Sequence, residues 1–416
     1  MTIELCNRSE CTGCALCASL CTRHAIMMVT DLNGFSYPSV DTNQCVECEK
    51  CRNACPVLSP SLLDATTVPE SLACWAKDSE LRRRSSSGGL FSVFAEHVLS
   101  KSGVAYGVVF DAGLKTVFAR ADSPDAITPM RGAKYIEADT ENLFRQVADD
   151  LKRGIPVLFS GTPCQNAALK RYVAALGLST SLLYQIDFIC HGVSSPALWK
   201  SFVEAIESKY HDKLKYVYFR DKSIGGWKSP AIRFSFQNRK DTFVSWSTVR
   251  LHIENAFISC YHKNLSLRES CSHCRCTGLP RHADITLGDA QMLYHHPEFR
   301  TQARDGISMI LLNTPKGKTL LDEVSTKIIY TLRPIAESRL PVPPAILHPR
   351  REQFLNDAQK LEFSKLIKKY SSFLKPPFRI GTILNGIMKS ILGYHTALSL
   401  REYIESVLCA LPRKKA

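Results

Sequence analysis

The chain has 416 residues, enough for two or three domains with sizeable hydrophobic cores. Hydrophobic residues make up 45% and charged residues 22%, which excludes wholesale disorder and a collagen-like fibre. The net charge is +14, from 53 Lys and Arg against 39 Asp and Glu. The longest uncharged apolar stretch of the C-terminal region, 390–400, is well short of the roughly 20 residues of a membrane span. The N-terminus has no apolar signal-peptide core, so we expect a cytoplasmic protein.

Cysteine usage points to thiolates that bind metal in a reducing compartment. Of the 17 cysteines, eight lie in two runs of the same spacing, CTGCALCASLC at 11–21 and CVECEKCRNACP at 45–56. Disulfide scaffolds are usually short and secreted, whereas this chain is long and carries no export signal. The two runs form an internal repeat of 34 residues.

The spacing of each run matches the bacterial ferredoxin motif, in which the fourth cysteine binds the cluster of the other run. We therefore predict two 4Fe-4S clusters, bound by Cys11, Cys14, Cys17 and Cys55 and by Cys45, Cys48, Cys51 and Cys21. Structural zinc is the alternative, because Cys-x-x-Cys pairs also suit zinc. Cys6 lies outside the pattern and is interpreted as a small apolar residue. Paired clusters pass single electrons, so the rest of the chain should hold a two-electron cofactor or a substrate.

A Ser-, Thr- and Pro-rich linker at 57–72 precedes alternating strands and helices, which are typical of an α/β core. Apolar segments predict strands at SLACWAK, GVAYGVVF, PVLFS and LLYQIDFIC, and KTVFAR predicts a hairpin partner for the second of them. Amphipathic segments predict helices at LFSVFAEHVLSK, ENLFRQVADDLKRG, NAALKRYVAAL and ALWKSFVEAIESKY. Residues 216–254 alternate in polarity and are predicted to be rich in strands.

Two loops that precede helices are candidate ligand sites. The first, SSSGG at 85–89, suits a phosphate or pyrophosphate at a helix N-terminus, and a plain helix cap is the alternative. The second, GTPCQ at 161–165, lies at the end of a parallel strand where ligands bind, and a tight turn with a buried cysteine is the alternative. The sequence has no GxGxxG, so an ordinary nicotinamide site is not supported.

Further cysteines lie at predicted strand ends or in loops. Four of them could together bind a third 4Fe-4S cluster: Cys164, Cys190, Cys271 and Cys274. Cys260 and Cys276 are alternatives for one of these positions, and scattered buried thiols are the competing interpretation. Asp284 and Asp289 follow in RHADITLGD.

The two runs are followed, in this order, by SSSGGLFS, RGAKYI, FSGTPCQ, DFICHGVSSP, RDKSIGGW and CSHC with HADITLGD. Over about residues 5–320 this set resembles the coenzyme F420 hydrogenase/dehydrogenase beta-subunit family, in the bacterial form with a fused N-terminal ferredoxin domain. The resemblance implies FAD on the α/β core, an iron–sulfur centre near the flavin, and electron exchange between them. Bacterial members often accompany polysaccharide-assembly proteins, so the family alone does not fix the substrate; a sugar-type or other small molecule, used in polysaccharide biosynthesis, is one candidate. Nothing in the sequence indicates that coenzyme F420 itself is used.

Matched motif by motif, the resemblance implies a cofactor site made of Ser87, Gly88, Gly89, Lys134, Tyr135, Thr162, Pro163 and Gln165. The first three would face the FAD phosphates or the adjoining cleft, and the last three would border the isoalloxazine ring. Lys134, Lys228 and Arg233 are candidate cations for a reduced flavin or an acidic substrate, with solvated surface charges as the alternative. His191 is a candidate proton donor, and a structural histidine is the alternative.

The C-terminal region is Pro-rich at 334–350, which predicts an extended strap. Residues 341–416 hold 13 Lys and Arg against 5 Asp and Glu, and apolar residues at 380–392 recur at helical spacing. These features predict a basic amphipathic helix that packs on the core or a partner, or contacts an anionic membrane surface peripherally. No nucleic-acid-binding motif is present.

The expected fold is an α+β ferredoxin-like iron–sulfur module, then an α/β flavin-binding core and a helical, basic C-terminal region. The expected segments are 1–60, 70–150, 151–330 and 331–416. We predict an iron–sulfur flavoprotein oxidoreductase that exchanges electrons with a redox partner protein or with a reduced deazaflavin or ferredoxin donor. The competing hypothesis is a non-catalytic electron carrier that docks on a partner enzyme.

Overall fold

The structure is a computed structural model that describes residues 3–59, 69–246, 251–338 and 342–374. The predicted amphipathic helix at 380–392 and the basic tail lie outside the described residues. Within the described ranges, no helix combines the length and the apolar character needed to cross a membrane.

The N-terminal module contains two copies of one small unit. It contains the antiparallel strands β1 (Ile26–Thr30) and β2 (Ser36–Val40) and the short helices α1 (Leu16–Leu20) and α2 (Lys50–Ala54). Ala15 and Glu49, which precede the two helices, both have a left-handed backbone, with φ of 59° and 57°. These residues are 34 positions apart, so the sequence repeat is also a backbone repeat that winds each cysteine run in the same way.

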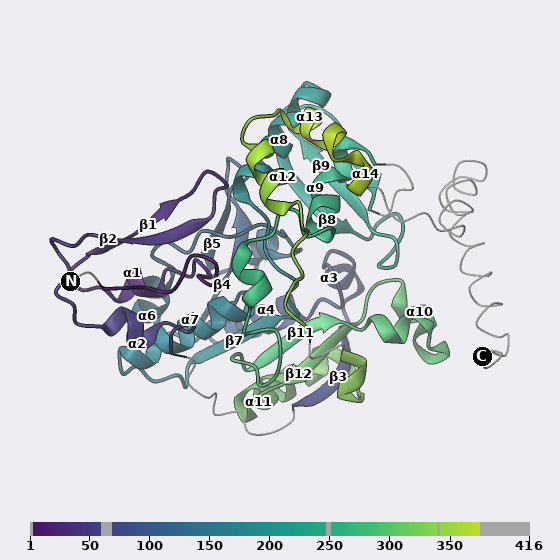
Figure 1. Cartoon of the computed structure of the whole chain (residues 1–416). Coiled ribbons are helices and arrows are strands. Elements are labelled where there is room, and N and C mark those ends of the chain that lie inside the picture. Colours follow the sequence, from purple (N-terminus) through teal and green to yellow (C-terminus); the bar gives the residue numbers. More distant parts are fainter. Residues whose placement is uncertain (1–2, 60–68, 247–250, 339–341, 375–416) are drawn as a thin grey trace, which may run out of the picture.

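The core is an eight-stranded mixed sheet (Figure 1). Its strands, in spatial order, are β13 (Ile328–Leu332), β3 (Glu70–Ala76), β12 (Ser308–Leu312), β11 (Ile285–Asp289), β7 (Leu183–Phe188), β6 (Val157–Ser160), β4 (Val104–Phe110) and β5 (Thr116–Ala121). β3, β11, β7, β6 and β4 run in one direction, and β12 is inserted antiparallel between β3 and β11. The predicted strands and the predicted β4–β5 hairpin are confirmed, although β3 begins inside the expected linker. Residues 70–150 and 151–330 both contribute strands, so a single sheet spans the proposed boundary at 150.

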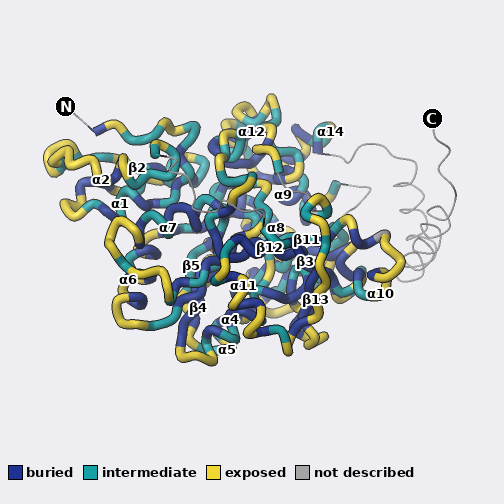
Figure 2. The backbone as a smooth tube through the Cα atoms, turned by 90° about the horizontal axis from the view of Figure 1, so that it is seen from below, coloured by how far each residue is buried: buried dark blue, intermediate teal, exposed yellow. Residues whose placement is uncertain are grey.

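Helices cover both faces of this sheet, as expected for an α/β core. One face packs against α4 (Leu90–Ser100), α5 (Pro124–Ile127) and α11 (Pro315–Glu323). The other packs against α6 (Leu143–Lys152) and α7 (Pro163–Ala175), and α1 of the N-terminal module joins the same apolar cluster through Leu16 and Leu20. Figure 2 shows that the strands are mostly buried and that exposed residues lie in peripheral loops and helices. Shorter elements complete this part: α3 (Ser79–Arg83), η1 (Thr128–Met130), η3 (Gln291–His295), η4 (Pro297–Phe299), α10 (Arg300–Ala303), η5 (Ser325–Lys327) and η6 (Ile335–Ser338).

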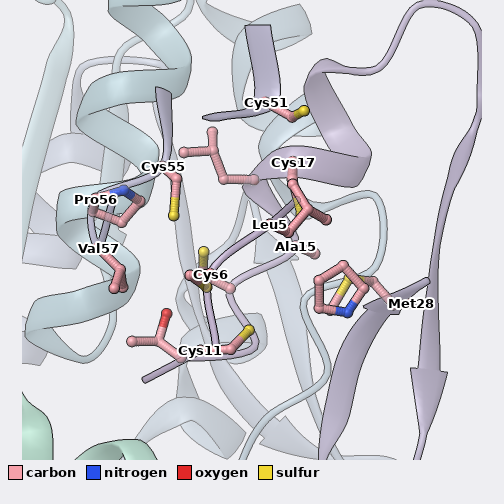
Figure 3. Close-up of a pocket in the computed structure, with 14 residues that line it drawn as sticks. Leu5, Cys6, Cys11, Ala15, Cys17, Met28, Cys51, Cys55, Pro56 and Val57 are labelled. Carbon is pink, nitrogen blue, oxygen red and sulfur yellow. The ribbon is translucent and has the colours of Figure 1, made fainter. Parts of the chain in front are cut away.

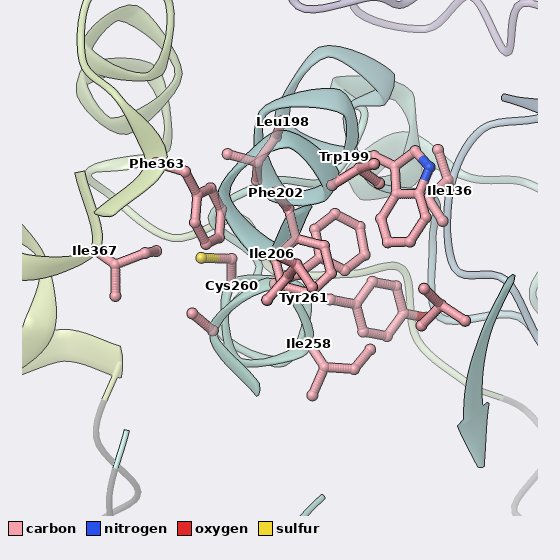
Figure 4. Packing of buried hydrophobic residues seen from close by; sticks show 14 of the residues in the cluster. Ile136, Leu198, Trp199, Phe202, Ile206, Ile258, Cys260, Tyr261, Phe363 and Ile367 are labelled. Atoms are coloured by element: carbon pink, nitrogen blue, oxygen red, sulfur yellow. The ribbon is translucent and has the colours of Figure 1, made fainter. Parts of the chain in front are cut away.

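A separate apolar cluster lies around an antiparallel three-stranded sheet of β8 (Leu214–Asp221), β9 (Ala231–Phe236) and β10 (Thr242–Ser245). It is covered by α8 (Pro196–Tyr210), α9 (Ile253–His262), α12 (Arg351–Ala358), α13 (Phe363–Lys369) and α14 (Ser371–Leu374). Figure 4 shows Phe363 and Ile367 of α13 facing Phe202 and Cys260. The Pro-rich segment before α12 runs over this unit, where Ala345 N donates to Cys271 O at 3.1 Å.

Candidate iron–sulfur and cofactor sites

The cysteines predicted for the first cluster line one cavity. This cavity is bordered by Cys11, Cys14, Cys17 and Cys55 together with apolar residues such as Leu5, Met28 and Val57. Figure 3 shows Cys11, Cys17 and Cys55 reaching this space from different segments of the module. Four thiols from two runs around an apolar cavity are what a 4Fe-4S cluster needs, so the residues present fit the predicted cofactor.

A second cavity is bordered by Cys21, Cys45, Cys48 and Cys51. Each run therefore contributes three cysteines to one cavity and its fourth cysteine to the other, with Cys51 bordering both. Cys48 is exposed, whereas Cys11 of the first run is buried. The second cavity is thus the one nearer to solvent.

Cys6 is more than the small apolar residue inferred from the sequence. It lines the first cavity, and its sulfur lies between those of Cys11 and Cys55 (Figure 3). The interaction with Cys6 lowers the pKa of Cys11 and that of Cys55 and raises the pKa of Cys6. The signal missed in the sequence is that Cys6 precedes the first run by only five residues.

The four cysteines predicted for a third cluster converge, although they come from separated segments. Cys164 lies in the first turn of α7, Cys190 follows β7, and Cys271 and Cys274 lie in and just after η2 (Glu269–His273). Burial raises the pKa of Cys190 well above its usual value, and the other three thiols raise it further. A Cβ on Gly192 would lie 3.3 Å from Cys271 Sγ, so the glycine keeps this chain close to the thiol group.

The structure places the two alternative ligands of this group, Cys260 and Cys276, in different environments. The Cys276 thiol hydrogen-bonds with Cys274 and therefore lies at the group. Cys260 instead packs in the apolar cluster of α8, α9 and α13. Cys14, which lines the first cavity, is close enough to Cys164 to raise its pKa, after the larger effect of burial.

In the described parts of the chain, no three Cys, His, Asp or Glu side chains converge tightly enough to hold a single metal ion. A four-iron cluster has no such requirement, because each thiolate binds a different iron atom.

The carboxyl ends of β6, β7 and β11 meet at one edge of the sheet, the edge that ligands favour in α/β folds. Asp289, the last residue of β11, pairs with Arg220 at 2.9 Å and accepts a hydrogen bond from Trp227 Nε1 at 3.1 Å. Arg220 Nε is buried and lacks a hydrogen-bond partner among the described residues. An oxygen atom of a bound anionic or carbonyl-bearing group would satisfy it. Arg220 lies in the RDKSIGGW motif, but sequence reasoning gave it no role.

An aromatic wall connects this edge with the third cysteine group. Tyr135, which has a left-handed backbone (φ 62°), packs against Trp246 and Tyr261 with ring centroids 5.6 and 4.9 Å apart. Tyr261 in turn packs against His191 at 5.4 Å, next to Cys190. Tyr135 thus lies between Arg220, which hydrogen-bonds to it, and the cysteine group.

The SSSGG loop is largely occupied by contacts inside the protein. Gly88 N donates to Ser308 Oγ at 2.9 Å, and Ser87 Oγ donates to Ile307 O at 3.2 Å. A Cβ on Gly88 would lie 2.6 Å from Cys74 O, and Gly89 caps α4 with φ of 89°. The helix cap accounts for Gly89 and the approach to Cys74 O accounts for Gly88, and these donors face β12 instead of an open phosphate site.

The other predicted site residues also have structural partners. Lys134 Nζ donates to four backbone carbonyls, those of Pro129, Met130, Arg131 and Gly132, and burial lowers its pKa to about 7. Thr162, Pro163 and Gln165 begin α7 as a capping box, in which Thr162 N donates to Gln165 Oε1 at 2.9 Å. These contacts position the segments on which Tyr135 and Cys164 lie.

The remaining candidates lie farther from a common centre. His191 is exposed, with Nε2 2.6 Å from Asn264 Oδ1. Arg233 pairs with Asp221 at 2.9 Å and Asp241 at 3.2 Å, and Lys228 is exposed. Asp284 lies before β11, at the opposite end from Asp289, where it accepts a hydrogen bond from Gln185 N at 2.9 Å.

Comparisons with known proteins agree with this architecture. Residues 10–58 match the 4Fe-4S dicluster domain, so the chain is an iron–sulfur electron-transfer protein. Residues 156–338 match the family described as the C terminus of the coenzyme F420 hydrogenase/dehydrogenase beta subunit. The chain belongs to this oxidoreductase beta-subunit family, in a form with an N-terminal ferredoxin domain.

No curated protein matches the chain. Among solved structures, a chain of the xenon-derivatised F420-reducing NiFe hydrogenase complex from Methanosarcina barkeri is similar at 15% identity. The match covers 75% of this chain and 96% of that one, with a TM-score of 0.42. A likeness of this strength supports no conclusion about function.

Proposed function

We propose that the protein is an iron–sulfur flavoprotein oxidoreductase. The convergence of Cys164, Cys190 and Cys271 beside Cys14 carries the proposal, because separated segments meet at one thiol group next to the first cavity. The proposed ligand sets are Cys11, Cys14, Cys17 and Cys55, then Cys45, Cys48, Cys51 and Cys21, and finally Cys164, Cys190, Cys271 and Cys274. FAD binds at the carboxyl edge of the central sheet, where a small-molecule or sugar-type substrate reacts.

The clusters supply one-electron transfer, and the flavin supplies two-electron chemistry that it can divide into single steps. Arg220 presents a buried positive charge to the cofactor, and Tyr135 and Tyr261 exclude water between the flavin edge and the cysteine group. His191, exposed next to Cys190, is the group that exchanges a proton with the substrate. Lys134 has an indirect role: it holds its loop in place, since its ammonium already donates to four backbone carbonyls.

Replacement of Cys164 by Ser tests the third cluster. A chain purified without oxygen should fall from about 12 to about 8 iron atoms, since one of three four-iron clusters loses a ligand. Cys74→Ala, at a buried cysteine on β3, is the matched control and should keep all of the iron. An unchanged iron content in Cys164→Ser would contradict the third cluster.

One observation favours the competing function, an electron carrier without a flavin. The donors of Ser87 and Gly88 already bond to the start of β12, which leaves fewer groups for a phosphate. Release and quantification of bound flavin separates the two functions, because the carrier would yield clusters and no flavin.

The second cavity is the proposed contact with a redox partner protein. Cys48 and Val46 are exposed there, whereas the first cavity faces the core. Membrane contact through the basic tail is a further proposal, and it falls outside the described residues.

A further inference from the structure

The two cavities of the repeat differ, among other lining residues, in one thiol. Cys6 stands five residues before Cys11, and the equivalent position before Cys45 is Val40. Cys6 lines the first cavity, whereas Val40 packs among apolar residues that include Ile3 and Ile26. Of the two described cavities, only the first therefore has a fifth cysteine outside the ferredoxin spacing.

Cys6 lies beside two proposed cluster ligands. It shares the first cavity with Cys11 from the first run and Cys55 from the second. Figure 3 shows the Cys6 sulfur between those of Cys11 and Cys55. Because both residues belong to the same proposed ligand set, one S–H group can reach two ligand sulfurs of a single cluster.

Hydrogen bonds to ligand sulfurs set the reduction potential of an iron–sulfur cluster. A donor offsets part of the negative charge on the sulfur, and the reduced cluster, which carries one more electron, gains the most from it. Two cations lie in the same place: Arg268 acts on Cys11, and Arg171 acts on Cys55. All three groups stabilise the reduced form of the first cluster.

We propose that Cys6 is a positioning residue that donates its S–H to the sulfurs of Cys11 and Cys55 and raises the reduction potential of the first cluster above that of the second. The inference rests on the proposed function, because it requires both clusters. It makes the buried, core-facing site the electron acceptor and the exposed site the donor. Electrons that arrive from a partner then move inward.

A potentiometric titration of the full chain, followed by electron paramagnetic resonance, tests this inference. In Cys6→Ala the ratio of reduced first to reduced second cluster should fall roughly tenfold, which is 59 mV for one electron. Cys6→Ser should retain much of the wild-type value, since its hydroxyl can still donate. Val40→Ala is the matched control and should shift neither potential. A Cys48→Ser background assigns the signals, because Cys48 borders only the second cavity.

Three results would overturn the inference. One is an unchanged potential in Cys6→Ala, and another is an equal shift of both clusters. The third is loss of about four iron atoms in both Cys6 variants, which would make Cys6 a ligand. A wild-type chain with fewer than about 8 iron atoms would instead overturn the proposed function on which this inference rests.

Discussion

Arg268 shows how one side chain can fix the N-terminal module to the core. It is 1% exposed, donates to Cys11 O at 2.8 Å and Ser36 O at 2.9 Å, and pairs with Glu137 at 2.7 Å. Burial raises the pKa of Glu137, and Arg268 counteracts this effect by favouring the carboxylate. The pair therefore keeps the first cluster site against the sheet only while both partners are present.

Arg268→Gln should lower the free energy of unfolding by about 3–5 kcal/mol, because it leaves a buried carboxylate without its cation. Urea denaturation followed by circular dichroism measures the change. Lys318→Gln, which breaks an exposed pair with Glu70, is the control and should cost at most about 1 kcal/mol. Equal losses in the two variants would show that the Arg268 pair has no special role.

At the residue scale, the cysteine ligands can be predicted from the sequence, whereas the residues that surround them cannot. The run spacing is local, so the grouping of Cys11 with Cys55 follows from the chain alone. Cys6 and Arg220 carry no such pattern, and their places become visible only when distant segments meet. Glycine is also ambiguous, since Gly88 is required by its approach to Cys74 O and a phosphate loop would need the same residue.

At the scale of elements, α7 joins the fold to the candidate site. Its capping box fixes the first turn, and Thr162 Oγ1 lies 3.1 Å from Cys164 Sγ. Thr162 therefore both caps the helix and contacts Cys164, a proposed cluster ligand.

Thr162→Ala should cost about 1 kcal/mol of unfolding free energy, the usual value for the loss of an N-cap side chain. Chemical denaturation measures this loss. Thr162→Ser keeps the capping oxygen and should remain within a few tenths of a kcal/mol of the wild type. A serine variant as unstable as the alanine variant would show that the cap is not what stabilises this turn.

The strands and helices of the core follow from apolar periodicity, because each pattern is local. The sheet order does not, since β12 enters between β3 and β11 and its pairing with β3 spans more than two hundred residues. The three-stranded sheet and helices α12–α14 form a separate apolar cluster that the proposed segment boundaries do not describe. Long-range pairing of this kind leaves no periodic signal in either partner.

At the scale of the whole molecule, three groups of cysteines line up from the surface to the core. The second cavity is exposed, Cys14 of the first lies near enough to Cys164 to affect its pKa, and the third group lies at the carboxyl edge of the central sheet. The aromatic wall continues from Tyr261 to Tyr135 and Arg220. This order suits a protein that carries electrons between a partner at its surface and a cofactor at its centre.

Iron, acid-labile sulfide and released flavin per chain, measured on protein purified without oxygen, test this account most directly. Three 4Fe-4S clusters and one flavin predict about 12 iron atoms, about 12 sulfides and one flavin per chain. About 8 iron atoms and no flavin, even after reconstitution with both cofactors, would contradict the proposed enzyme and leave the electron carrier.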